Sequence, residues 1–107
     1  MENLEILVIS TNPELMEVIL RLVNNKEGWT GTGTGAESIE KSKEIFTASP
    51  KFDIVLFDVG VSEAEEKELT AIFKTQNSEV IAIRHYGGGS GLLYNEVQAA
   101  LEDKNSV

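Results

Sequence analysis

The chain has 107 residues, a length typical of one domain, which can bury about 60–70% of its unfolded surface. Hydrophobic residues make up 41% and charged residues 25%, as in ordinary globular proteins. It contains no cysteine, which excludes disulfides, thiol catalysis and thiolate metal ligands. With 18 acidic and 9 basic residues, its net charge of −9 repels phosphate backbones and anionic lipid. We therefore expect a protein partner, no nucleic acid and no membrane.

The first residues are acidic where a secretion signal would be basic, and no apolar run approaches the length of a membrane span. We therefore expect a cytoplasmic protein. No repeat or linker interrupts the sequence, which predicts a single domain over residues 1–107.

The N-terminal part predicts a strand, a helix, a strand and a helix. Residues 4–9 are mostly apolar and indicate a buried strand. Asn12 can then cap a helix whose first turn begins at Pro13. Residues 29–35 alternate Thr and Gly, which favours a short, weak strand, and residues 37–48 favour a helix. The first helix is expected to turn one apolar face inward, formed by Leu15, Val18, Ile19, Leu22 and Val23.

The stretch from Phe52 to Gly60 is the centre of the predicted fold. Residues 54–57 form a continuous apolar run, as in strands that are covered on both faces of a parallel sheet. Asp58 follows directly and so lies at the carboxyl end of that strand. Open α/β sheets place their ligands at this end. Asp58 is therefore the first candidate for a functional residue.

A helix, a strand and a last helix complete the predicted order. Ser62 and Glu65 have the spacing of a capping box and begin a helix that extends to about Lys74. Residues 79–83 indicate a fourth strand, and a helix is expected after residue 91. The third helix should bury Leu69, Ile72 and Phe73 and leave Glu63, Glu66 and Lys67 in solvent. Strands that alternate with helices predict a three-layer, doubly wound parallel α/β sheet.

The order of elements and the strand ends resemble the receiver domain of two-component response regulators, whose fold is flavodoxin-like. The resemblance covers about residues 4–83. Residues 6–13 are similar to the family's first strand and acidic corner, and residues 52–59 are similar to its phosphoacceptor strand, with Asp58 at the acceptor position. Residues 80–84 resemble the fourth strand and its switch residue. The resemblance implies a role in signal transduction or a phosphorelay, with a sensor kinase or regulator as partner.

The chain departs from the family at the residues that support phosphorylation. The acidic pair that holds magnesium in the family is replaced by Ser10 and Thr11, and neutral hydroxyls are weaker ligands for this hard cation. An incoming phosphoryl group brings roughly −2 of charge, which needs a cation nearby. We therefore expect no metal and no cofactor, with Mg²⁺ bound only if Asp58 is a working phosphoacceptor. Arg84 occupies the switch position, where it could pair with Asp58 and lower the pKa of that carboxyl.

The sequence after the fourth strand is too short for the family's further helix, fifth strand and last helix. We therefore expect four strands in the order 2-1-3-4, with the fourth at an uncovered edge. The lysine that the family carries after its fifth strand has no counterpart. An unpaired edge can template another chain, which predicts a homodimer through strand four, the last helix or both.

Two glycine-rich segments and the side chain of His85 each have both a functional and a structural interpretation. Gly87, Gly88, Gly89, Ser90 and Gly91 precede a predicted helix and could cradle an anion, although a mobile loop is the simpler interpretation. Residues 31–36 match a relaxed dinucleotide fingerprint, for which we favour close packing between helix and sheet. His85 and Trp29 are interpreted as surface or packing residues.

Three functional hypotheses follow. The first is a stand-alone, atypical receiver that is not an enzyme and works by protein–protein interaction without conventional Mg-dependent phosphorylation. The second is a genuine phosphoacceptor that uses Asp58. The third is an anion- or nucleotide-binding module that uses the loop from Gly87 to Gly91.

Overall fold

The computed structural model describes residues 4–25, 31–58 and 60–84. Four strands form one parallel sheet in the order β2-β1-β3-β4, which confirms the predicted topology. The predicted last helix lies outside the described residues. The elements along the chain are β1 (Leu4–Ile9), α1 (Pro13–Asn25), β2 (Gly31–Ala36), α2 (Ile39–Ala48), β3 (Ile54–Phe57), α3 (Glu63–Gln76) and β4 (Ile81–Arg84).

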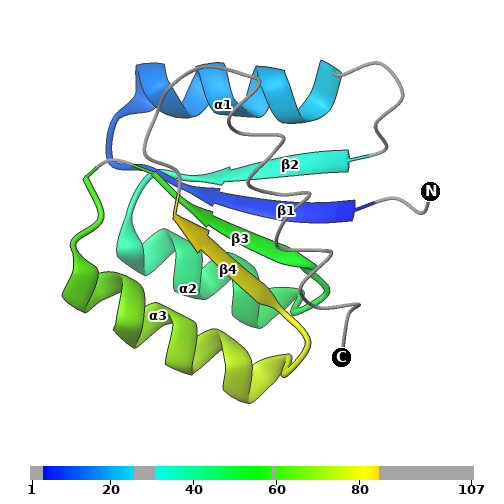
Figure 1. Ribbon diagram of the computed structural model, residues 1–107, viewed down its shortest axis with the longest axis vertical. Helices are drawn as coiled ribbons and strands as arrows, with labels where there is room; N and C mark the ends of the chain where they lie inside the picture. The colour runs from blue at the N-terminus through cyan, green and yellow to red at the C-terminus, as the bar shows by residue number, and fades with distance from the viewer. Residues whose placement is uncertain (1–3, 26–30, 59, 85–107) are drawn as a thin grey trace.

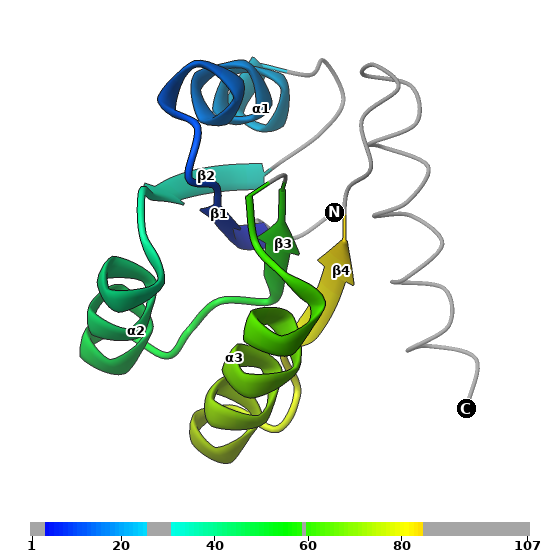
Figure 2. The ribbon, with the colours of Figure 1, turned by 90° about the vertical axis from the view of Figure 1, so that its left-hand side faces the viewer.

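The helices cover both faces of the sheet, as the alternating order predicts. Helix α1 lies on one face, over β2 and β1, whereas α2 and α3 lie side by side on the other (Figure 1). The view along the strands separates these layers clearly (Figure 2). None of the described helices combines the length and apolarity needed to cross a membrane.

The two central strands contribute side chains to both layers of the core. Alternate residues of β1 and β3 face opposite sides of the sheet, and residues 6–9 and 54–57 are at most 1% exposed. One set packs with α1 and the other packs with α2 and α3. This double burial explains the unbroken apolar runs of both strands. The α1 side holds Ile6, Val8, Ile54 and Leu56, and the other side holds Leu7, Ile9, Val55 and Phe57.

Helix α1 begins as predicted and buries only part of the expected set of side chains, because Ile19 and Val23 lie in the core. The Asn12 carboxamide oxygen accepts hydrogen bonds from the main-chain N–H groups of Glu14 and Leu15, at 3.0 and 3.1 Å. Leu15 and Val18, which were expected to face inward, are 41% and 48% exposed. The helix carries two adjacent apolar rows, and only one can contact the sheet. The buried row consists of Met16, Ile19 and Val23.

The glycines of β2 let α1 approach the sheet closely. A Cβ atom on Gly33 would lie 3.0 Å from Leu20 Cδ2, and one on Gly35 would lie 2.8 Å from Met16 Sδ. A side chain at either position would require Leu20 or Met16 of α1 to shift. The packing interpretation of the glycines is therefore confirmed.

Helix α3 begins and ends with side-chain caps. The predicted capping box is confirmed, because Ser62 N–H donates to Glu65 Oε1 at 2.9 Å and Glu65 N–H donates to Ser62 Oγ at 3.1 Å. After the last turn, the Asn77 side-chain amide donates to the carbonyls of Pro50 and Phe52, both at 3.1 Å. These bonds tie the end of α3 to the segment that enters β3.

Candidate functional site at the carboxyl end of the sheet

Asp58 lies where the sequence places it, immediately after the central strand β3. Its main-chain N–H donates to the carbonyl of Ile9 at 3.0 Å, so the ladder between β1 and β3 continues through this residue. The side chain is 3% exposed. Asp58 is therefore held at the carboxyl edge of the sheet and covered by its surroundings.

The carboxylate of Asp58 is incompletely satisfied. Its Oδ2 atom accepts no hydrogen bond, and it is the one buried side-chain polar atom of this kind in the described part of the chain. A buried oxygen without a donor costs free energy, more so when it carries charge. Most buried polar atoms in proteins have a hydrogen-bond partner, so an atom without one needs an explanation, and a functional role is one such explanation. The structure therefore retains Asp58 as the leading candidate residue.

Ser10 and Thr11 follow β1 at the same edge, because Ile9 and Phe57 are register partners in neighbouring strands. Ser10 is fully buried, and its hydroxyl donates to the carbonyl of Asn12 at 3.2 Å. The same oxygen accepts a hydrogen bond from the N–H of Asn12, also at 3.2 Å. The Ser10 hydroxyl therefore shapes the turn into α1.

Thr11 contacts the chain segment that follows Asp58. A Cβ atom on Gly60 would lie 1.8 Å from Thr11 Oγ1, and Gly60 has a φ angle of +93°. Only glycine adopts this conformation readily, and only a residue without a side chain leaves room for Thr11. The turns after β1 and β3 are thus packed directly against each other.

The donor set at this edge is a poor match for magnesium. Asp58 is the single carboxylate contributed by the three candidate positions, and the hydroxyl of Ser10 is already engaged. Magnesium in proteins is usually held by carboxylates together with water and substrate phosphates. Among the described residues, no group of three or more histidines, aspartates or glutamates could hold a metal ion.

Arg84 does not pair with Asp58, so the predicted positive neighbour is wrong. The Arg84 Nε atom donates to the Glu66 carboxylate, and Nη2 donates to the carbonyls of Val61 at 2.7 Å and Ser62 at 3.4 Å. In the described chain no ion pair joins Arg84 to Asp58. The first turn of α3 and the two residues before it offer three acceptors together, and the guanidinium turns toward them.

Glu66 is a site residue that sequence reasoning missed. It was expected to be solvated, but its side chain is 29% exposed and forms an ion pair with Arg84, whose side chain is 17% exposed. The pairing depends on the position of the first turn of α3 beside the end of β4. The sequence did contain a signal for this ion pair. It places a basic residue at the end of a strand and an acidic residue in the first turn of the preceding helix.

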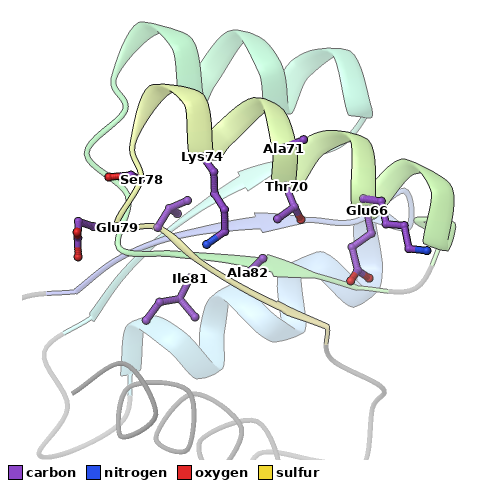
Figure 3. A pocket seen from close by; sticks show the side chains of 10 residues that line it. Glu66, Thr70, Ala71, Lys74, Ser78, Glu79, Ile81 and Ala82 are labelled. Carbon is purple, nitrogen blue, oxygen red and sulfur yellow. The ribbon is translucent and has the colours of Figure 1, made fainter. Parts of the chain in front are cut away.

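A groove between α3 and β4 is a second feature that the sequence did not reveal. Its volume is about 810 Å³. Side chains of α3, among them Thr70 and Lys74, extend over β4, where Ala82 points toward them (Figure 3). The groove lies along the last strand of the described sheet, and Glu66 lines it as well. This groove is a candidate contact surface for another chain.

Several predicted features lie outside the described residues. They are Trp29, His85 and the possible anion loop from Gly87 to Gly91. The anion-binding hypothesis therefore remains a prediction.

Comparison with solved structures supports a receiver-like fold. A response regulator receiver domain protein from Clostridium thermocellum superimposes with a TM-score of 0.63 at 17% identity, covering 95% of this chain and 97% of that one. The signal receiver domain of an HD domain-containing protein from Pseudomonas fluorescens Pf-5 gives 0.64 at 12% identity, covering 99% and 100%. A pilus assembly protein (cpaE) from Burkholderia thailandensis gives 0.58 at 16% identity, covering 92% and 98%.

No family model matches the sequence, and the comparison with curated proteins gives no match. The identities to the solved structures are low, so these likenesses show the fold and do not carry function across. The chain has the four-stranded parallel α/β architecture of the flavodoxin-like receiver fold.

Proposed function

We propose that this protein is an atypical receiver-like signalling module that acts in the cytoplasm by binding a partner protein, without conventional Mg-dependent phosphorylation. The observation that carries the proposal is the environment of Asp58. An aspartate stands at the position that resembles a phosphoacceptor, but it is buried, forms no ion pair with any described residue and lies beside the hydroxyl residues Ser10 and Thr11. The receiver-like fold supports a signalling module, and the environment of Asp58 argues against Mg-dependent phosphorylation of this residue.

The charge at the site explains why phosphorylation of Asp58 is disfavoured. A phosphoryl group adds roughly −1.5 to −2 of charge, and the site would have to accommodate it on a side chain whose Oδ2 atom already lacks a hydrogen-bond donor. Arg84 is held by Glu66 and two carbonyls. Neither Ser10 nor Thr11 adds negative charge that would attract a divalent ion. The protein would therefore signal through its surface rather than through a modified aspartate.

Incubation with acetyl phosphate and magnesium, followed by intact mass spectrometry, tests this proposal. We expect no adduct above the level seen in Asp58→Asn. Asp53→Asn is the matched control, because it removes a carboxylate at the other end of β3. A phosphoryl adduct that persists in Asp53→Asn and disappears in Asp58→Asn would contradict the proposal. It would favour the second candidate function, a genuine phosphoacceptor, which the unpartnered Asp58 oxygen also supports.

The edge of β4 and the groove beside it are the proposed contact surface. Strand β4 hydrogen-bonds to β3 on one side and ends the described sheet. Strand edges recruit other strands through main-chain hydrogen bonds, and adjacent side-chain pockets add specificity. The partner would be a sensor kinase, a regulator or a second copy of this chain joined through this edge or the last helix. The net charge of −9 disfavours nucleic acid and anionic membranes.

Sedimentation velocity at increasing protein concentration distinguishes a second copy from a different partner. Ile83→Lys places a charge on β4, and Leu15→Lys places the same charge on an exposed position of α1. If the β4 edge forms a homodimer, only Ile83→Lys should shift the protein toward monomer. A clean monomer at high micromolar concentration would contradict the homodimer and leave a different protein as the occupant.

A further inference from the structure

We propose that Arg84 is a fixed clamp that holds the segment from Gly60 to Glu66 in one arrangement, whatever Asp58 carries. This inference rests on the proposed function, because it describes how that module keeps its binding surface constant. The clamp joins the end of β4 to the start of α3, and residues 59–62 connect this start to Asp58.

The geometry of Arg84 supports a clamp with several contacts. The guanidinium reaches two consecutive carbonyls, those of Val61 and Ser62, and the carboxylate of Glu66 one turn further along α3. A guanidinium donates from a rigid planar fork, so several acceptors fix its orientation together. Movement of the segment away from β4 would break these charge-assisted hydrogen bonds at once.

Partial burial makes this ion pair different from the other arginine–glutamate pair in the described chain. The side chains of Arg84 and Glu66 are 17% and 29% exposed. Those of Arg21 and Glu17, which pair within α1 at 3.0 Å, are 66% and 72% exposed. Exposed pairs contribute little because water and salt screen them, whereas the partly buried pair is screened less.

The rest of the segment is fixed by independent contacts. Gly60 is packed against Thr11 with a φ angle that other residues rarely adopt. Ser62 and Glu65 close the capping box. Val61 is 4% exposed and belongs to the core cluster under α2 and α3. Arg84 therefore joins β4 to a segment that already has little freedom.

The presence of an arginine at position 84 affects the surface formed by α3 and β4. Arg84 has three acceptors on α3 and its preceding loop, and all three bonds would have to break before the guanidinium could turn elsewhere. The surface formed by α3 and β4 would then be set by folding alone, including the groove that Glu66 lines.

Amide hydrogen exchange measured by NMR on the unmodified protein tests the clamp. The amides of Ser62, Glu65 and Glu66 report on the segment, because each is hydrogen-bonded within it. In Arg84→Ala these amides should exchange about tenfold faster or more, since local opening no longer breaks charge-assisted bonds. Arg21→Ala is the matched control and should change them less than about twofold.

Two further variants keep the test decisive. Glu66→Ala should also accelerate exchange in the segment, and it serves if Arg84→Ala does not fold. Asp58→Asn should not accelerate exchange of the same amides by more than about twofold, because the clamp does not depend on Asp58.

The clamp would be overturned if Arg84→Ala and Glu66→Ala resembled Arg21→Ala, or if Asp58→Asn accelerated exchange as much as Arg84→Ala. These measurements use no phosphodonor. Their failure is therefore distinguishable from the appearance of an adduct on Asp58, which would contradict the proposed function instead.

Discussion

Asp53 and Asp58 stand at opposite ends of β3 and have opposite environments. The Asp53 Oδ2 atom accepts a hydrogen bond from the N–H of Glu5 at 2.9 Å, whereas the Asp58 Oδ2 atom is buried without a donor. One carboxylate therefore helps to hold β1 beside β3, and the other raises the free energy of the folded state.

Replacement of these two aspartates should have opposite effects on stability. We expect Asp58→Asn to raise the free energy of unfolding by about 1 kcal/mol, because a neutral amide is less costly to bury than an unpaired carboxylate. Asp53→Asn should not raise it, because the amide loses the charge that strengthens the bond to Glu5. Urea unfolding of both variants checks this, and a loss of stability in Asp58→Asn would show that its carboxylate is stabilised in the fold.

Gly60 should tolerate no side chain. In Gly60→Ala the positive φ angle alone should cost about 1–2 kcal/mol, and the contact with Thr11 adds to this cost. Thermal unfolding of Gly60→Ala, alone and combined with Thr11→Gly, separates the two causes. The cost of Gly60→Ala should be smaller in the Thr11→Gly background. Equal costs in both backgrounds would show that Thr11 does not press on this position.

Phe46 should be a central residue of the core between the sheet and its two helices. Its ring stacks on Phe73 at a centroid distance of 4.3 Å and on Phe52 at 5.8 Å, and the residue is fully buried. Phe46→Ala should therefore cost about 3–5 kcal/mol in denaturant unfolding. Leu15→Ala is the control and should change stability by less than about 0.5 kcal/mol, because Leu15 is an exposed apolar residue. A similar loss in both variants would contradict the observed orientation of α1.

Glu65 should make stability depend on pH in the acidic range. The Ser62 main-chain N–H, and then the Ser62 side chain, lower the pKa of the Glu65 carboxyl below its ordinary value of 4.5. A lowered pKa in the folded state stabilises the protein above the unfolded-state pKa, and this contribution is lost as the pH falls through the folded-state pKa. The stability difference between wild type and Glu65→Gln should therefore be full near neutral pH and shrink below pH 4.5. A difference that stays constant down to pH 3, roughly one unit below the reference glutamate pKa, would contradict this role of the capping box.

The helix caps and the central strand were predictable because their signals are local, whereas the strand order was expected from the resemblance to receiver domains. The cap at Asn12, the capping box at Ser62 and the apolar run that ends at Asp58 each depend on a few adjacent residues. The position of Ser10, Thr11 and Asp58 at one edge followed from the parallel arrangement, in which the carboxyl ends of strands meet.

The errors came from features that depend on packing between elements. Helix α1 has more apolar side chains than can contact the sheet, and its packing buries Met16 together with the predicted Ile19 but leaves Val18 exposed. The partner of Arg84 depends on where the first turn of α3 lies, and spacing along the chain does not encode that. Opposite charge suggested Asp58 as the partner of Arg84. The guanidinium instead binds three acceptors at the start of α3.

The side chain of Asn24 makes the two edge strands of the described sheet, β2 and β4, differ in their free hydrogen-bonding groups. Its carboxamide oxygen accepts a hydrogen bond from the main-chain N–H of Gly33 at 3.0 Å, so this amide of β2 is already occupied. A sheet that continues from one chain to the next needs an unpaired strand edge on both sides. Chains with two such edges can extend into open fibres. The β2 edge is therefore a weaker template for a further strand than the β4 edge. If two copies associate through β4, this difference favours a closed pair over an open fibre, and Asn24→Ala would reduce the difference.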